Sequence, residues 1–293
     1  MKLIISIGIL YIFTKINNMI NFLIWSPAYS ETSGGIIALH KLADILAKQG
    51  ENVYIHTEKT FEGSSAKVIG PNDNMQLSVE NTMVVYPEII IGNPFGFPHV
   101  TRWLLNTPGK LGGDGIYGEN DLVFKYYNYF DAPDESKVLG ELRTFSLKLD
   151  KFYNKNLERK GECYIVKKGW DKVLDKHEPD AINIDNYISD DYLIDIFNRT
   201  ERFIAYDSMT FHIQQAALCG CLPIVIPDEG VSKEEFITRA PINKYGMAYG
   251  FDDIENANLH LMKSHLENME QESMDLIKNY IQCCYNHMYK KNI

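Results

Sequence analysis

Apolar and polar positions follow one another along the chain in a pattern that predicts strands and helices in turn. Residues 21–25 form an apolar run, and residues 36–46 carry apolar side chains at the three- and four-residue spacing of an amphipathic helix. Gly50 ends this stretch, and residues 52–56 form a second apolar run. Together these segments predict a βαβ unit, whose two strands are expected to be parallel.

The same order continues to the end of the chain. Further strands are expected at residues 83–86, 122–125, 163–166, 181–184, 203–206, 222–226 and 245–249. Helices are expected at residues 171–175, 191–197 and 210–218, after a capping box at Ser232 to Glu235, and along residues 252–289. Two such arrays predict an α/β fold with two Rossmann-like parallel-sheet domains facing a cleft, where the carboxyl ends of the strands bind the ligand.

One tract, residues 92–121, breaks this order. It is rich in glycine and proline and dense in polar groups, so we expect it to be too irregular for the core. Within it, Arg102 and Trp103 are expected to anchor a helix. Charged residues become frequent between residues 140 and 160, and this change in composition predicts the domain boundary.

The first 18 residues also stand apart from the repeated order. Lys2 precedes about eleven mostly apolar residues and Lys15 follows them, which makes the apolar stretch too short to span a bilayer. Met19 then opens a segment that leads directly into the first expected strand. We interpret residues 1–18 as lying outside the fold, as an upstream extension or a weak membrane-contacting segment, with a signal peptide as the remaining alternative.

Composition narrows the class of protein. Apolar residues make up 45% of the chain and charged residues 23%, as in soluble globular proteins with a sizeable core. The formal net charge of −10 gives no support to a nucleic-acid partner, which calls for a basic face, although it leaves room for a local basic phosphate site. The five cysteines show no metal-binding spacing, and their odd number argues for reduced thiols in a cytoplasmic protein.

The most informative junction lies where the apolar run 203–206 reaches Asp207. In a parallel sheet this point adjoins the start of the next helix, whose unpaired N–H groups and partial positive charge bind phosphate. Ser208 and Thr210 add hydroxyl groups, and Asp207 is placed for a sugar hydroxyl. The alternative is that Ser208 or Thr210 only caps the helix.

Spacing after Asp207 adds a family resemblance. Gln215 lies eight positions later, and Ala216, Gly220, Pro223, Ile224 and Val225 follow. This pattern resembles the E-x7-E motif of the family 4-like GT-B glycosyltransferases, with Asp207 and Gln215 at the two acidic positions. The resemblance implies a nucleotide-sugar donor, with the first acid near the sugar and the second position holding the ribose hydroxyls.

The match departs from the motif in three ways. Asp207 is one methylene shorter than glutamate, and one extra residue follows Gly220. Gln215 lacks the charge of glutamate but keeps a carbonyl acceptor and adds N–H donors, so we expect it to bind a ribose diol less tightly. Gln214, one position earlier, remains an alternative to Gln215.

Residues near the two predicted sheets complete the expected donor site. The run 163–166 ends in Lys167, Lys168 and Gly169, and the resemblance implies that these lysines neutralise the donor diphosphate, with Lys168 and Asp207 as catalytic residues. The alternative is a solvated basic turn. The remaining residues implied to bind the donor or acceptor are Gly34, Gly35 and, for stacking on the base, Tyr187.

The resemblance also implies the roles of the domains. Residues 19–150 would form the N-terminal acceptor-side domain and residues 151–270 the nucleotide-sugar donor domain, with residues 271–293 as a helix packing back onto the first domain. We therefore predict a glycosyltransferase of polysaccharide biosynthesis that needs no metal or cofactor beyond its donor. It would act on a glycan or lipid-linked acceptor in the cytoplasm, with peripheral membrane contact.

Several points stay open at this stage. If the reaction inverts configuration it needs a base, for which the candidates are Glu31, His99, Asp114 and Glu119. Packing is the alternative role for His99, and acceptor binding is a second role for Arg102. The competing functions are a nucleotide-sugar epimerase of the same fold and a non-catalytic module that binds a nucleotide-sugar.

Overall fold

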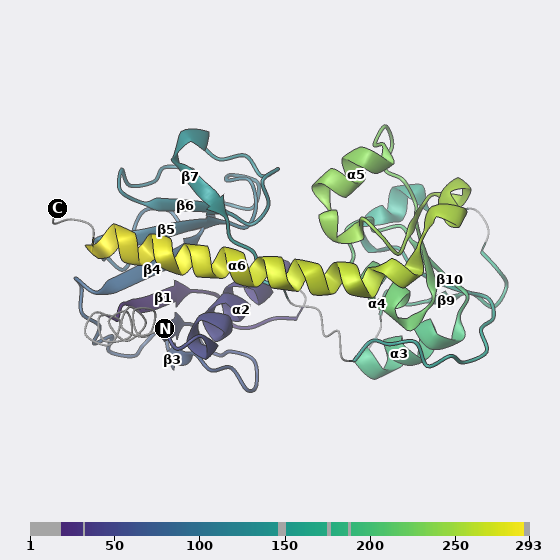
Figure 1. The fold of residues 1–293 in the computed structure, drawn as a ribbon, viewed down its shortest axis with the longest axis horizontal. Coiled ribbons are helices and arrows are strands. Elements are labelled where there is room, and N and C mark those ends of the chain that lie inside the picture. Colours follow the sequence, from purple (N-terminus) through teal and green to yellow (C-terminus); the bar gives the residue numbers. More distant parts are fainter. Residues whose placement is uncertain (1–18, 32, 146–150, 175–176, 187–188, 290–293) are drawn as a thin grey trace, which may run out of the picture. The chain divides into compact units, whose positions relative to one another are not determined.

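The computed structural model describes residues 19–31, 33–145, 151–174, 177–186 and 189–289 (Figure 1). The chain divides into two compact units, the first Met1–Ser146 with Glu272–Ile293 and the second Leu147–Gln271. Each unit holds its own parallel sheet, which confirms the predicted fold class. The expected extension at residues 1–18 and the candidate Tyr187 lie outside the described residues.

The first unit contains a seven-stranded sheet in the order β3-β2-β1-β4-β5-β6-β7. Its strands are β1 (Asn21–Trp25), β2 (Asn52–His56), β3 (Lys67–Ile69), β4 (Thr82–Pro87), β5 (His99–Leu104), β6 (Leu122–Lys125) and β7 (Val138–Glu141). All neighbouring strands are parallel, and helix α2 (Gly34–Lys48) connects β1 to β2. The strand order reverses between β1 and β4, and in open sheets of this kind ligands bind at such a switch point.

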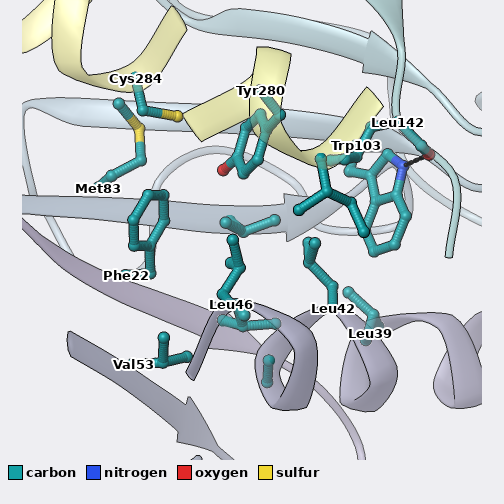
Figure 2. Close-up of a cluster of buried hydrophobic side chains, with 14 of the residues drawn as sticks. Phe22, Leu39, Leu42, Leu46, Val53, Met83, Trp103, Leu142, Tyr280 and Cys284 are labelled. Carbon is teal, nitrogen blue, oxygen red and sulfur yellow. Dashed lines mark hydrogen bonds between the residues drawn. The ribbon is translucent and has the colours of Figure 1, made fainter. Parts of the chain in front are cut away.

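The core of the first unit joins its sheet to two helices. One is α2, and the other is the C-terminal part of α6 (Met262–Tyr289), the long yellow helix of Figure 1. Figure 2 shows the buried side chains that meet there, among them Phe22, Leu39, Leu42, Leu46, Met83, Trp103, Tyr280 and Cys284. Two polar side chains in this core are satisfied, since the Trp103 indole donates to the Leu142 carbonyl at 2.8 Å and the Tyr280 hydroxyl to Thr101 Oγ1 at 3.2 Å. The 28-residue α6 is amphipathic, and no helix among the described residues is long and apolar enough to cross a membrane.

The second unit contains a five-stranded parallel sheet in the order β12-β11-β10-β8-β9. Its strands are β8 (Glu162–Ile165), β9 (Ile182–Asn183), β10 (Arg202–Ala205), β11 (Leu222–Val225) and β12 (Ala248–Tyr249), and its helices are α3 (Asp190–Arg199), α4 (His212–Cys219) and α5 (Lys233–Arg239). Ser232 caps α5 as predicted, because its hydroxyl accepts a hydrogen bond from the Glu235 amide at 3.1 Å. This strand order reverses between β8 and β10, which makes that pair the switch point of the second sheet.

Several sequence-based predictions about the fold were wrong. The tract 92–121 contributes to the core, because it contains strand β5, which is parallel to both of its neighbours, β4 and β6. Its buried residues include Val100, Thr101, Trp103 and Leu104. Arg102 therefore lies on a strand and anchors no helix. Its side chain is 2% exposed, and its guanidinium donates to Asp121 at 2.7 Å and to the Gly92 carbonyl at 2.6 Å, within the loops around β5.

The expected helix at residues 171–175 is also displaced. The chain instead forms a short 3-10 helix, η2 (Lys167–Lys172), directly after β8. Glycine in the first turn disfavours an α-helix at this point. The shift matters because it places all three lysines of the segment, Lys167, Lys168 and Lys172, at the carboxyl end of β8.

Candidate donor site at the switch point of the second sheet

The carboxyl ends of β8 and β10 lie next to each other in the second unit. Ile165, the last residue of β8, pairs with Ala205, the last residue of β10. Segment η2 continues from β8, and the turn Asp207–Thr210 continues from β10 into α4. The structure therefore brings together the two segments that the sequence singled out, the lysine pair and the turn at Asp207.

Contact between Gly169 and Tyr206 fixes these segments to each other. A β-carbon at Gly169 would lie 2.7 Å from the Cβ of Tyr206 and closer still to its carbonyl group, so only glycine fits. The Gly169 amide also donates to the Val166 carbonyl at 2.7 Å, which closes the turn after β8. Gly169 thus serves the packing of η2 against the end of β10.

The turn from Asp207 to Thr210 is stabilised by its own side chains. Asp207 is 8% exposed, and its Oδ1 accepts a hydrogen bond from the Met209 amide at 3.2 Å. Thr210 Oγ1 accepts from the His212 amide at 3.4 Å within the turn, but the N-cap residue of α4 is Phe211, which makes no side-chain capping hydrogen bond. The Ser208 hydroxyl donates to Asp228 Oδ2 at 2.9 Å, so this hydroxyl is engaged within the protein.

Gln215 lies in the first turn of α4 and is bound to His212. The His212 Nδ1 and Gln215 Oε1 atoms are 2.6 Å apart, and because the amide oxygen only accepts, Nδ1 carries the proton. Burial lowers the pKa of His212; the hydrogen bond to Gln215 opposes this shift, and the nearby charge of Lys167 adds to it. The ring is therefore neutral at pH 7.

The side chain of Gln214, unlike that of Gln215, is buried inside the second unit. It is 1% exposed and its amide donates to the side-chain oxygen of Asn243, inside the second unit. Of the two adjacent glutamines, Gln215 is the half-buried one at the start of α4, and Gln214 belongs to the core.

Sequence reasoning missed two further residues at this edge, Lys172 and Asp228. The Lys172 ammonium donates to Asp228 Oδ1 at 2.6 Å and to the Ile226 carbonyl at 3.0 Å. Although burial opposes it, hydrogen bonds from Lys172 and Ser208 lower the pKa of Asp228 and keep it ionised. The signal was present, because Asp228 follows the apolar run 222–226 as Asp207 follows the run 203–206.

The switch point of the first unit lies between β1 and β4. Gly34 and Gly35 open α2 there, after Ser33, whose hydroxyl accepts from the Ile36 amide at 3.5 Å. A β-carbon at Gly34 would meet nothing within 4 Å, and one at Gly35 would meet only Leu105, at 3.6 Å. Neither glycine is required by the packing of this unit.

A buried carboxyl group, Glu88, follows β4 at the same switch point. It is 3% exposed, and its Oε2 accepts a hydrogen bond from the Leu105 amide, after β5, at 2.9 Å. Burial raises the pKa of Glu88, and hydrogen bonds from backbone amides offset part of this shift. Sequence reasoning missed Glu88, although an acidic residue directly after the buried run 83–86 was a usable signal.

The four candidate bases are scattered in the first unit. His99 opens β5 and so lies at the amino edge of the sheet, where its ring meets that of His287 edge-on at 5.4 Å between centroids. This placement assigns His99 to packing. Asp114 accepts from the Ile116 amide at 3.0 Å within a loop, and Glu31 and Glu119 are exposed.

Comparison with known proteins bears on the fold. No family model matches the chain, and no curated protein sequence does. Among solved structures, a glycosyltransferase from Rickettsia africae ESF-5 is 12% identical, with a TM-score of 0.55 over 94% of this chain and 100% of that chain. WaaG, a glycosyltransferase involved in lipopolysaccharide biosynthesis, is 8% identical (TM-score 0.46, 92% and 98% covered), and the glycosyltransferase SnogD from Streptomyces nogalater is 9% identical (TM-score 0.42, 90% and 100% covered).

The fold is therefore that of the GT-B glycosyltransferases, as the sequence resemblance implied. The family 4-like label receives no support from these comparisons and stays a prediction.

Proposed function

We propose that the protein is a glycosyltransferase that moves a sugar from a nucleotide-diphosphate sugar to a glycan or lipid-linked acceptor. One observation carries the proposal. At the switch point of the second sheet, Lys167 and Lys168 after β8 lie beside the turn Asp207–Thr210 and the start of α4. Open parallel sheets bind nucleotides at such points, and the GT-B fold supports the same reading.

The lysines and α4 would hold the diphosphate. Lys168 is exposed on η2, and the amino end of α4 carries the partial positive charge of a helix terminus. When the bond between the sugar and the diphosphate breaks, negative charge grows on the leaving phosphate. A fixed ammonium group and oriented amides stabilise that charge more than they stabilise the bound donor, which lowers the barrier.

Asp207 and Gln215 would bind the two sugars of the donor, the transferred sugar and the ribose. Asp207 is the acidic residue placed for a sugar hydroxyl. Because Gln215 Oε1 already accepts from His212, the amide N–H groups are the part of Gln215 suited to a ribose oxygen. This makes Gln215 a donor to the ribose, whereas a glutamate at this position would act as an acceptor.

The acceptor belongs to the first unit in this proposal. Gly34 and Gly35 leave room at the switch point between β1 and β4, where the backbone of a close-packed loop or helix start can approach a ligand. A glycan or lipid-linked acceptor, a role in polysaccharide biosynthesis, a cytoplasmic location and peripheral membrane contact through residues 1–18 complete the proposal. No metal ion or cofactor besides the donor is included.

A second candidate function is a module that binds a nucleotide-sugar without turning it over. The observation that favours it is that Asp207 is 8% exposed and bound to the Met209 amide, while position 215 carries a neutral amide. Such a site would retain the phosphate contacts, with the carboxylate of Asp207 buried and a neutral amide at the second acidic position of the motif.

Incubation of the purified protein with a panel of UDP-, GDP- and dTDP-sugars separates these functions. Slow hydrolysis or sugar transfer, followed by chromatography of the released nucleotide, is the expected result. Binding without turnover would support the module, and interconversion of two sugars would support an epimerase. No binding of any member of the panel would refute the proposed function.

A further inference from the structure

We propose that Asp185 is a positioning residue that sets the backbone at Lys167 so that this lysine meets the diphosphate of the donor. Asp185 lies two residues after β9, next to η2. The inference rests on the proposed function and adds a residue that neither the sequence motif nor the comparison with known structures assigns.

The carboxylate of Asp185 is hydrogen-bonded to the backbone at the start of η2. Its Oδ1 accepts hydrogen bonds from the amides of Val166 and Lys167, at 2.8 and 3.1 Å. Asn183 holds the carboxylate in turn, because its amide group donates to Asp185 Oδ2 at 3.2 Å and its side-chain oxygen accepts from the Asp185 amide at 2.8 Å. Hydrogen bonds from two backbone amides to one ionised group are strong and fix the direction of the chain.

Lys167 needs such a restraint. Its φ angle is 35°, in the left-handed region that residues with a β-carbon rarely adopt. Backbone strain of this kind persists only where surrounding contacts hold it in place, and it is concentrated at ligand clamps. The contacts here are Asp185 on one side and the turn closed by Gly169 on the other. Glycine adopts this conformation without strain, so a lysine at position 167 indicates a use for its side chain.

That use is consistent with the surroundings of Lys167. It lies two residues after Ile165, the end of β8, which pairs with Ala205, two residues before Asp207, and its positive charge contributes to the lowered pKa of His212 in the first turn of α4. Asp185 itself is negative, so through charge alone it would repel a diphosphate. A favourable effect of Asp185 on diphosphate binding must therefore come from the conformation that it imposes on Lys167.

The two effects have opposite signs, which makes the inference testable. Equilibrium titration of the full chain with UDP and with GDP is the measurement. We expect Asp185→Ala to weaken binding of the preferred nucleotide by about tenfold, the loss of about one charge-assisted hydrogen bond. Asp185→Asn keeps a side-chain oxygen for the two amides and is expected to restore most of the affinity. Asp171→Ala is the matched control, since it removes an exposed carboxylate from η2 itself and is expected to leave binding unchanged or slightly tighter.

A double-mutant cycle shows whether Asp185 acts through Lys167. Lys167→Gly removes the ammonium and also the strain. In that background, we expect Asp185→Ala to change UDP or GDP affinity by less than about twofold, because no side chain is left to position. Melting temperatures of all variants show whether each is folded, and Asp185→Ser, which also lacks the carboxylate, carries the test if Asp185→Ala does not fold.

The outcomes are distinct. Equal affinity of the wild type and a folded Asp185→Ala variant would overturn the inference and leave the proposed function standing. A tenfold loss that persists in the Lys167→Gly background would also overturn it, since Asp185 would then act independently of Lys167. A wild-type protein that binds neither UDP nor GDP nor any nucleotide-sugar would overturn the proposed function and this inference with it.

Discussion

Gly169 packs directly on the backbone of Tyr206, the residue that follows β10. A β-carbon on Gly169 would lie 2.7 Å from the Cβ of Tyr206, well inside van der Waals contact. This single contact ties the lysine segment η2 to the turn at Asp207, the two halves of the proposed donor site. The geometry of the site therefore depends on a position where no side chain fits.

Replacing Gly169 by alanine should consequently damage both folding and binding. Overpacking of this kind is expected to lower the free energy of unfolding by about 1–3 kcal/mol, and η2 must move away from Tyr206. Thermal melts and a UDP or GDP titration measure the two effects. Gly34→Ala is the control for stability, because a β-carbon there meets nothing within 4 Å, and its melting temperature is expected to stay the same or rise. Unchanged stability of Gly169→Ala would show that η2 and Tyr206 are not in contact.

The adjacent glutamines should respond in opposite ways to truncation. Gln215→Ala is expected to weaken nucleotide binding with little change in melting temperature, since the side chain is half-buried at the start of α4. Gln214→Ala is expected to cost about 1–3 kcal/mol of stability, because it leaves Asn243 without its buried partner, and to spare binding. If Gln214→Ala abolished binding while the protein stayed stable, the alternative alignment with Gln214 in the motif would be correct.

The C-terminal helix should be essential to the first unit. Tyr280 of α6 is fully buried against the first sheet, near Phe22 and Phe124 (Figure 2). Tyr280→Ala is expected to lower the free energy of unfolding by about 3–5 kcal/mol, the range for a buried aromatic side chain. Tyr280→Phe removes only the hydroxyl, with its hydrogen bond to Thr101, and should cost about 1 kcal/mol. Chemical denaturation measures both variants, and equal losses would mean that the ring does not fill the core.

Stability should fall in mild acid because of His40. Its ring is buried, with Nε2 3.0 Å from the Pro27 carbonyl and Nδ1 2.9 Å from Thr60 Oγ1. Burial lowers the pKa of His40, although the bond to Pro27 opposes this shift. Below the ordinary pKa of 6.5, the unfolded chain binds a proton that the folded protein does not, so folding is penalised increasingly as the pH falls.

The test compares the wild type with His40→Gln between about pH 7.5 and about pH 5.5. The wild type is expected to lose up to about 1.4 kcal/mol per pH unit from this group, and the variant should lack that part of the slope. Parallel pH profiles for the two proteins would show that His40 accepts a proton as readily when folded as when unfolded.

Periodicity predicted the strands that are buried on both faces. The apolar runs 21–25 and 122–125 coincide with β1 and β6, and the run 83–86 lies within β4, because a buried parallel strand reads as a short continuous apolar segment. The sequence pattern did not predict strand β5, because its centre carries a charged residue, Arg102. The burial of Arg102 is compensated by Asp121 and by carbonyl groups of the preceding loop. Those partners are distant in sequence and cannot be read from a local pattern.

The candidate site was predictable only in part. Lys167 and Lys168 were identified because they end an apolar run, and the structure places that run beside the one ending at Asp207. Lys172, Asp185 and Asp228 make their contacts with other loops, and these contacts depend on the strand order, which a single sequence does not reveal. The split between Gln214 and Gln215 likewise depends on the exact start of α4.

A crystal structure of the protein with UDP or GDP tests the central claim most directly. The account predicts that the two phosphates lie against the turn Asp207–Thr210, with the ammonium group of Lys167 or Lys168 within hydrogen-bonding distance and the ribose beside Gln215. A nucleotide bound elsewhere on the chain, with both lysines turned away from it, would contradict the account.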